Sequence, residues 1–147
     1  RGALAEMREL LYELRPADAG EQNLAQAIRS RAAAFQRRTG LEAHVEAPTS
    51  LLLPADRAHA LLRIVQESLT NINRHARASK VRLELRPGPP LALRITDDGR
   101  GFDSASVEPG RLGLISMRER AAAIGATLEL RSAPGAGTTI TVTLLEG

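Results

Sequence analysis

The sequence predicts a two-layer α/β sandwich, in which a mixed five-stranded sheet has helices packed on one face. Five segments alternate apolar with polar residues, which is the period of a strand with one buried face. A sheet covered on both faces would instead show continuous apolar runs. Other segments repeat apolar residues at helical spacing, so each can place an apolar stripe against the sheet. A chain of 147 residues suits one such domain with a single core.

The helical segments have recognisable ends. We expect helices at residues 3–14, 21–38, 54–76 and 114–124. Pro16 ends the first, because the residue before a proline avoids the α region. Gly40 and Gly125 follow the second and the last, where a glycine commonly stops a helix. The first helix looks appended, so we place the domain itself at residues 17–147.

The strands follow from strict alternation. We expect them at residues 41–47, 81–85, 91–95, 128–130 and 140–144. Turn sequences at 87–90 and 134–137, rich in proline and glycine, predict hairpins between neighbouring strands. The sheet should therefore be mostly antiparallel or mixed.

Composition excludes several classes of function. The chain has no cysteine, so disulfides and thiolate metal sites are ruled out. The net charge is +3, but aromatic residues make up only 2%, which leaves few platforms for stacking bases. We therefore expect no nucleic-acid partner. No apolar run approaches the roughly 18 residues that span a bilayer.

A first candidate site lies on the long helix, in the segment from Gln66 to Ala76. Its polar residues Glu67, Asn71, Arg74 and His75 recur at spacings of three and four and so share one stripe. A carboxylate, an amide oxygen and a guanidinium on one face suit hydrated Mg²⁺ and phosphates. An ordinary polar helix surface would show the same pattern.

A second candidate follows the strand at 91–95, in Asp97-Asp98-Gly99-Arg100-Gly101-Phe102. Glycines at alternate positions allow a sharp turn and let a planar ligand approach the backbone. An aspartate at a strand end can accept a hydrogen bond from an exocyclic amine. The alternative is a plain surface turn, for which Asp-Gly is a common dipeptide.

Further glycines precede a helix, in Gly113-Leu114, and join the last two strands, in Gly137-Thr138. A glycine at a helix N-terminus can present unpaired N–H groups to an anion, although hinges and hairpins use glycine too. Other nucleotide motifs are missing: the sequence contains neither a P-loop nor a complete dinucleotide fingerprint.

Taken in order, these segments resemble the ATPase domain of bacterial sensor histidine kinases, within the superfamily that includes gyrase and Hsp90. Glu67 with Asn71 resembles the N box of that family, and Asp97-x-Gly99-x-Gly101 resembles its first glycine box. Gly113-Leu114 and Gly137-Thr138 resemble the second and third. The resemblance covers roughly residues 20–146 and implies the Bergerat-type ATP-binding fold.

The finer resemblance is to the subfamily paired with NarL-type response regulators. It rests on three segments: Gln66 to Asn71 with Arg74-His75-Ala76, Met117 to Arg120, and Leu4 to Pro16. The last is similar to the end of the second helix of the dimerisation and phosphoacceptor domain, which makes residues 1–16 its C-terminal remnant. Ser116 departs from a glycine common in the subfamily, and Leu112 from a polar residue.

The resemblance implies a role for each residue. Asn71 would coordinate Mg²⁺, Glu67 would orient a metal-bound water or assist as a base, and Arg74 and His75 would lie near the phosphates of ATP. Asp97 would accept the adenine amine with support from Thr138. The remaining site residues would bring backbone close to the nucleotide: Gly99, Gly101, Gly113 and Leu114. Residues 103–112 would form a lid.

The resemblance also implies partners. The parent protein would be a homodimer that transfers the γ-phosphoryl group of ATP to a histidine outside this chain and then to a NarL-type response regulator. This part would be cytoplasmic, in a parent that can be anchored in the cell membrane. Two alternatives are a Ser/Thr kinase of the anti-sigma-factor type and a non-catalytic ATP-binding interaction module.

Overall fold

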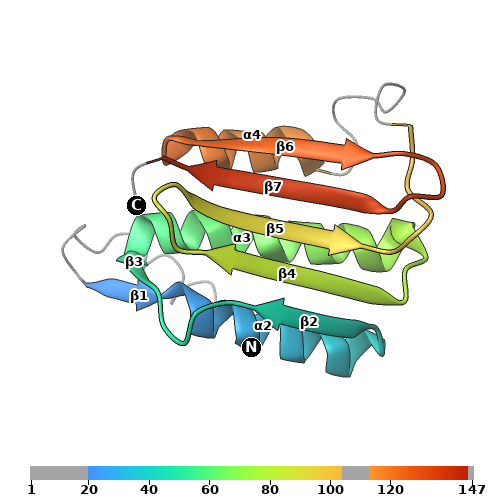
Figure 1. The fold of residues 1–147 in the computed structure, drawn as a ribbon, viewed down its shortest axis with the longest axis horizontal. Coiled ribbons are helices and arrows are strands. Elements are labelled where there is room, and N and C mark those ends of the chain that lie inside the picture. The colour runs from blue at the N-terminus through green and yellow to red at the C-terminus, as the bar shows by residue number, and fades with distance from the viewer. Residues whose placement is uncertain (1–19, 104–112, 146–147) are drawn as a thin grey trace, which may run out of the picture.

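A five-stranded mixed sheet forms one layer of the protein (Figure 1). The structure is a computed structural model that describes residues 20–103 and 113–145. The strands are β2 (Glu42–Glu46), β4 (Lys80–Arg86), β5 (Leu91–Asp97), β6 (Ala126–Ser132) and β7 (Thr138–Leu144). Their order is β2-β4-β5-β7-β6, in which only the β2–β4 pair is parallel. The predicted mixed sheet is thereby confirmed.

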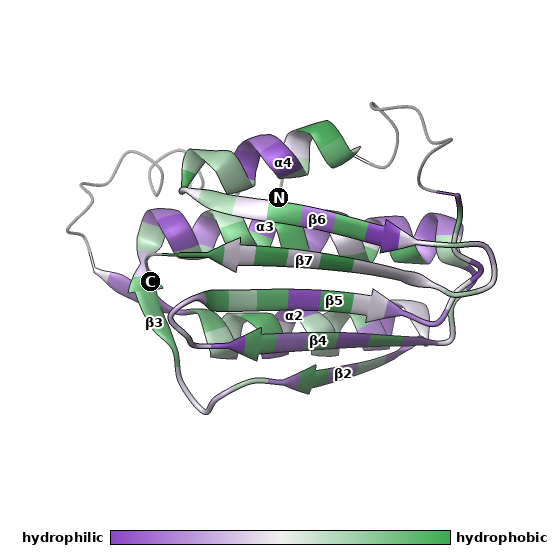
Figure 2. Ribbon diagram, turned by 45° about the horizontal axis from the view of Figure 1, so that its top comes forward, coloured by the Kyte–Doolittle hydropathy of each residue, from purple (hydrophilic) through white to green (hydrophobic). Residues whose placement is uncertain are grey.

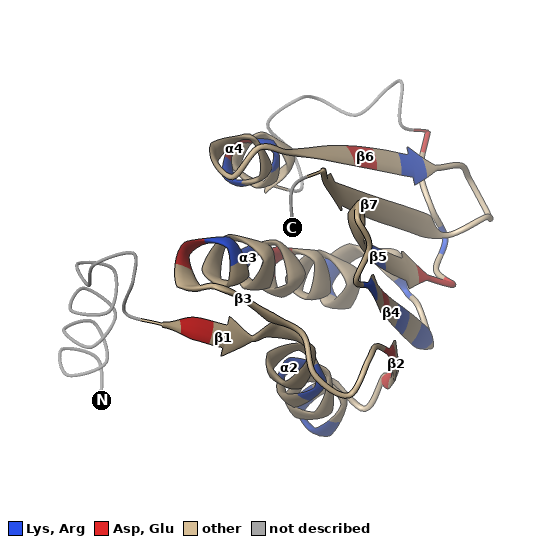
Figure 3. Cartoon of the chain, turned by 60° about the vertical axis from the view of Figure 1, so that its left-hand side comes forward, with Lys and Arg blue, Asp and Glu red and all other residues tan. Residues whose placement is uncertain are grey.

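The second layer consists of helices α2 (Leu24–Thr39), α3 (Ala55–Asn71) and α4 (Leu114–Ala123). They cover one face of the sheet, as the view along the layers shows (Figure 3). Side chains of β4 and β5 alternate between buried and more exposed positions, and green and purple bands alternate along these strands in Figure 2. The other face of the sheet is thus open to water, as the alternation predicted.

Helix α2 begins later than the sequence suggested. We expected it to start near Glu21, but residues Glu21–Asn23 form a short strand, β1, which pairs antiparallel with β3 (Leu52–Pro54). The side chain of Asn23 caps the helix by accepting from Gln26 N at 3.2 Å, and it also accepts from Leu51 N at 3.1 Å. An N-cap residue is extended, so it can end a strand and start a helix at once.

The remaining features of α2 follow the sequence. Gly40 caps its C-terminus in the left-handed conformation and donates its backbone N–H to Gln36 O, at 2.9 Å. The predicted inward-facing residues are all buried: Leu24, Ile28, Ala32 and Phe35.

The long helix also agrees, with one local difference. The predicted stripe is buried along α3 and just beyond: Ala58, Leu61, Val65, Leu69 and Ile72. From Ile72 to Ala76 the chain continues as a π-helical turn, η1, and Arg77 then reverses it with a positive φ of 52°. A π-turn widens the helix and often marks a functional site. Here it follows Asn71 directly.

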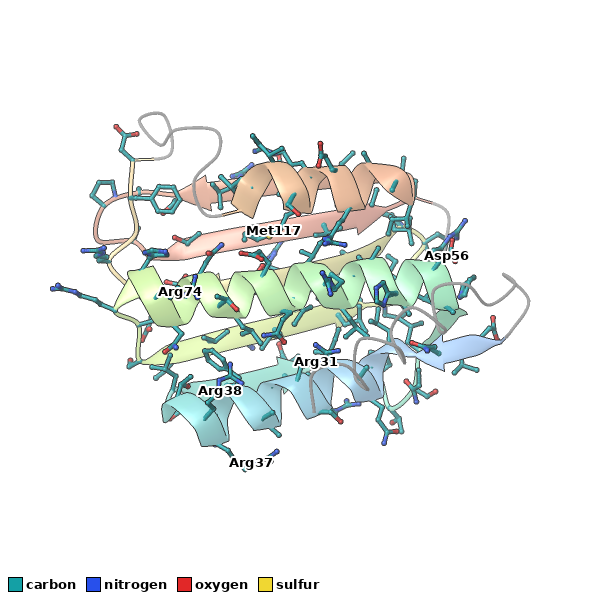
Figure 4. The ribbon with its side chains drawn as sticks, turned by 180° about the vertical axis from the view of Figure 1, so that it is seen from behind. Arg31, Arg37, Arg38, Asp56, Arg74 and Met117 are labelled. Atoms are coloured by element: carbon teal, nitrogen blue, oxygen red, sulfur yellow. The ribbon has the colours of Figure 1, made fainter. Side chains whose placement is uncertain are left out.

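Helix α4 packs beside α3 and β6. Gly113 precedes it with a positive φ of 65°, and Met117 is 1% exposed. Figure 4 shows Met117 on the side of α4 that faces α3, and Ser68 Oγ lies 3.6 Å from its sulfur. The expected helix at 3–14, the domain boundary after residue 16 and most of the expected lid lie outside the described residues.

Candidate functional site

A cavity of about 270 Å³ opens between the end of the long helix, the end of β5, the start of β7 and the start of α4. Six of the predicted site residues line it: Asn71, His75, Asp97, Gly101, Leu114 and Thr138. They come from four separate segments of the sequence, which the fold brings together. Its other lining residues are Ser68, Ile72, Ala76, Ile95, Arg100, Phe102, Leu130 and Ile140.

Asp97 is the buried carboxylate of this cavity. It ends β5 and is 5% exposed, directly across from Thr138 in the antiparallel register. Its Oδ1 accepts the backbone N–H of Gly99 at 2.8 Å, and the backbone N–H of Thr138 also donates to it. Burial raises the pKa of Asp97 above its ordinary value, and these two hydrogen bonds oppose that rise. The arrangement places a buried hydrogen-bond acceptor in the wall of a cavity that is lined mostly by apolar residues.

The walls of the cavity are largely aliphatic. Ile95 and Ile140, which are register partners on β5 and β7, face it together with Leu130 of β6 and Leu114 of α4. Apolar walls with a few converging polar groups are typical of a small-molecule site. Leu114 was among the predicted residues, but sequence reasoning missed Ile95, Ile140 and Leu130, because alternation marks them as ordinary core positions.

Three glycines allow the surrounding segments to pack closely. A Cβ at Gly99 would meet the carbonyl oxygen of Ala76, and a Cβ at Gly137 would meet that of Asp97. Gly101 has a φ of 62°, and a Cβ there would meet the carbonyl oxygen of Ala133. These glycines are therefore required where protein backbones approach one another, whatever they contribute to a ligand.

Arg100 is a site residue that the sequence analysis did not select. Its backbone N–H donates to Ala76 O at 2.7 Å, and its Nε donates to His75 O at 2.8 Å. These bonds satisfy carbonyls at the end of the helical segment, where a cation is also favoured. The Asp97-to-Phe102 loop is thus held against the end of the long helix.

The polar residues predicted on one stripe of the long helix do not all line the cavity. Asn71 and His75 line the cavity, whereas Glu67 lies beside Gly113, at whose position a Cβ would come within 2.8 Å of Glu67 Oε2. Arg74 is exposed, near the end of the long helix in Figure 4, and is not one of the lining residues. Among the described residues, no three His, Cys, Asp or Glu side chains cluster as metal ligands.

Asp98 anchors the Asp97-to-Phe102 loop to the start of β4. Its carboxylate accepts the backbone N–H groups of Ser79 and Lys80, at 2.8 and 2.9 Å, and the Ser79 hydroxyl at 2.7 Å. These hydrogen bonds, first that from the Lys80 backbone, lower the pKa of Asp98 to about 2. Asp98 therefore ties the end of β5 to the start of β4.

Comparisons with known proteins find similar sequences and similar folds. The family model described as "Histidine kinase-, DNA gyrase B-, and HSP90-like ATPase" matches residues 56–147. The chain is 37% identical over 138 residues to the sensor protein VraS of Staphylococcus saprophyticus, and the alignment covers 93% of this chain and 40% of that protein. It is 36% identical over 138 residues to the sensor histidine kinase LiaS of Bacillus subtilis, covering 93% of this chain and 38% of that protein. The chain thus spans about two fifths of the length of these relatives.

Solved structures share the fold. The histidine kinase domain of the Erythrobacter litoralis EL346 blue-light activated kinase superposes with a TM-score of 0.72 at 28% identity, over 83% of this chain and 60% of that one. The ATP-binding domain of PrrB from Mycobacterium tuberculosis gives the same TM-score of 0.72 at 19% identity, over 84% of this chain and 94% of that one. The second likeness is one of fold alone.

Proposed function

Because the chain belongs to the family of histidine kinase-, DNA gyrase B- and HSP90-like ATPases, we propose that it is the ATP- and Mg²⁺-binding catalytic domain of a two-component sensor kinase. The observation that carries this proposal is the buried Asp97 carboxylate in the wall of the mostly apolar cavity. LiaS is a sensor histidine kinase, and a further relative, DegS of Brevibacillus brevis, is a signal transduction histidine-protein kinase/phosphatase. Both favour this class over an anti-sigma-type Ser/Thr kinase or a non-catalytic module.

The adenine base would occupy the apolar part of the cavity. Ile95 and Ile140 provide aliphatic surface for a planar ring, and Asp97 accepts a hydrogen bond from the exocyclic amine. A charged acceptor in a water-poor site makes such a bond strong. Thr138 lines the same end and supports base recognition.

The phosphates would lie toward the helical side. Asn71 offers an amide oxygen to Mg²⁺, and Glu67 offers a carboxylate to a water bound to the metal. Both are hard oxygen donors of the kind that Mg²⁺ prefers. The metal, when bound, neutralises phosphate charge. Arg74 and His75 add positive charge or hydrogen-bond donors near the phosphates, and Gly113 with Leu114 bring the start of α4 close to them.

The reaction of the parent protein would be phosphoryl transfer from ATP to a histidine of its dimerisation and phosphoacceptor domain. Positioning and charge neutralisation dominate such a transfer, so this domain contributes by holding the nucleotide. From the histidine the phosphate would pass to a response regulator of the NarL type. We propose a homodimeric parent, of which residues 1–16 are the last part of the helical domain and 17–147 the catalytic domain. Its catalytic part would be cytoplasmic, and the parent can be anchored in the membrane.

Among the described residues, none of the helices is both long and apolar enough to cross a bilayer. The three histidines are His44 on β2, His59 on α3 and His75 on η1. None has the sequence context of a phosphoacceptor. The chain should therefore bind Mg-ATP and remain unlabelled after incubation with γ-labelled ATP. Stable label on one of its own histidines contradicts this division of roles.

Titration with a fluorescent ATP analogue, with and without Mg²⁺, tests the site. Asp97→Ala should weaken binding in both conditions, because the base loses its charged acceptor, by about tenfold or more. Asn71→Ala should weaken binding mainly when Mg²⁺ is present. Asn73→Ala is the matched control, since Asn73 is exposed on the same helical segment. If both site variants bind as the wild type does, the site is wrongly assigned.

A further inference from the structure

Ser132 connects two segments that line the cavity, the Asp97-to-Phe102 loop and the start of β7. It ends β6, is partly buried, and does not itself line the cavity. Its Oγ accepts the backbone N–H of Phe102 at 2.9 Å and donates to Gly137 O at 3.0 Å. The same Oγ lies 2.8 Å from Thr138 Oγ1. One hydroxyl thus joins the Asp97-to-Phe102 loop to the hairpin that carries Thr138.

Counting protons fixes the direction of the last of these bonds. A serine hydroxyl has one proton and two lone pairs. Because the proton of Ser132 is directed at Gly137 O, the bond between the two hydroxyls must be donated by Thr138. Ser132 then accepts from Phe102 N and from Thr138 Oγ1, which uses its full hydrogen-bonding capacity. With its proton engaged, Thr138 Oγ1 has only lone pairs to offer the cavity.

We propose that Ser132 is a positioning residue that holds the Thr138 hydroxyl as an acceptor, so that the base end of the cavity favours purines with a 6-amino group over those with a 6-oxo group. The proposal rests on the proposed nucleotide function and deepens it. Asp97 and Thr138 face each other across β5 and β7, so two acceptors lie at this end. A 6-amino group carries two N–H donors, whereas the oxygen of a 6-oxo group is an acceptor and would meet acceptors.

The experiment compares ATP and GTP as competitors of a fluorescent ATP analogue on the 147-residue chain. Ser132→Ala frees the Thr138 hydroxyl to rotate and donate. We expect the affinity for ATP to fall about two- to tenfold, which is the effect of one net hydrogen bond, while GTP loses less or gains. The ATP-to-GTP preference therefore falls. Ser132→Thr retains the hydroxyl and should therefore keep the ATP-to-GTP preference of the wild type.

Two further variants separate positioning from general stability. Thr139→Val is the matched control, because the Thr139 hydroxyl contacts Thr96 at 3.4 Å and does not line the cavity. Thr138→Val removes the acceptor itself and should lower the preference. Adding Ser132→Ala to Thr138→Val should lower it no further, since Ser132 acts through Thr138. If Ser132→Ala does not fold, Ser132→Thr and Thr138→Val can still overturn the proposal, by a loss of the preference in the first or its retention in the second.

Three results overturn the proposal: equal losses of ATP and GTP in Ser132→Ala, a Ser132→Thr variant that loses the preference, or a Thr138→Val variant that keeps it. Failure of the proposed function is distinguishable, because the wild-type chain would then bind neither the analogue nor ATP. If the wild type prefers ATP and the variants leave this preference unchanged, only the proposed role of Ser132 is rejected.

Discussion

Replacing Asp98 tests how firmly the Asp97-to-Phe102 loop is attached to the sheet. The carboxylate accepts three hydrogen bonds, two from the backbone N–H groups of Ser79 and Lys80 and one from the Ser79 hydroxyl. Asp98→Ala removes all three. Hydrogen bonds contribute about 1 kcal/mol each, but these donors are exposed and regain water. We therefore expect the free energy of unfolding to fall by about 1–2 kcal/mol.

Asp98→Asn is the matched control. Its amide oxygen can still accept from both backbone N–H groups, and its NH₂ can donate to the Ser79 hydroxyl, which is able to accept. The three hydrogen bonds survive in a neutral form, so we expect a loss of less than about 0.5 kcal/mol at pH 7, as for exposed charges screened by solvent. Urea denaturation of both variants and the wild type measures the difference.

The dependence on pH gives a second readout of the same prediction. The pKa of Asp98 is about 2 in the folded chain and lies near 3.9 in an unfolded one. A lowered pKa stabilises the fold above the unfolded value, and this contribution is lost as the pH falls from about 4 to about 2. The wild type should therefore lose stability relative to Asp98→Asn in this window. An alanine variant as stable as the asparagine variant, or equal acid profiles for wild type and Asp98→Asn, would refute the reasoning.

Two other predictions concern the cavity. Gly101→Ala should lower the free energy of unfolding by more than about 2 kcal/mol in urea denaturation, because φ is 62° and the new Cβ would meet the carbonyl oxygen of Ala133. Gly135→Ala, with a φ of 79° and open space around it, should cost only about 1–2 kcal/mol, and equal losses would contradict the packing argument. Burial raises the pKa of Asp97. The affinity for a fluorescent ATP analogue should therefore fall as the pH drops through that raised value, because protonation of the carboxylate replaces an acceptor with a donor. If the pH profile of the affinity follows only the titration of the phosphates and has the same shape in Asp97→Ala, this would argue against a contact between Asp97 and the base.

Much of the fold was predictable because each main element repeats a simple period. Alternation predicts the five strands of the large sheet, and the apolar stripe of the long helix predicts its buried face. The β1–β3 pair was not predictable in this way, since each strand has only three residues. The π-helical turn at Ile72–Ala76 was not either, because it keeps a helical pattern of residue types while changing the hydrogen bonding.

The candidate site could be predicted where polar residues stand out from their apolar surroundings in the sequence. Asn71 on a helix face and Asp97 before two glycines are polar residues at places where the fold alone does not require them. Arg100 and Ser132 escaped notice because their importance lies in bonds to His75 O, Phe102 N and Thr138 Oγ1, up to 30 residues away along the chain. Spacing within one segment carries no information about such partners.

The apolar walls show why the sequence cannot separate core from cavity. Ile95 and Ile140 belong to the same buried cluster as the rest of the sheet face, and they also line the cavity. A base between them would extend the core, so ligand binding and folding are coupled through the same surfaces. At a ligand concentration 100 times Kd this coupling adds about 2.7 kcal/mol to stability. Periodicity predicts that a side chain faces inward. Only the three-dimensional arrangement shows that the inward-facing side chains leave a cavity beside Asp97.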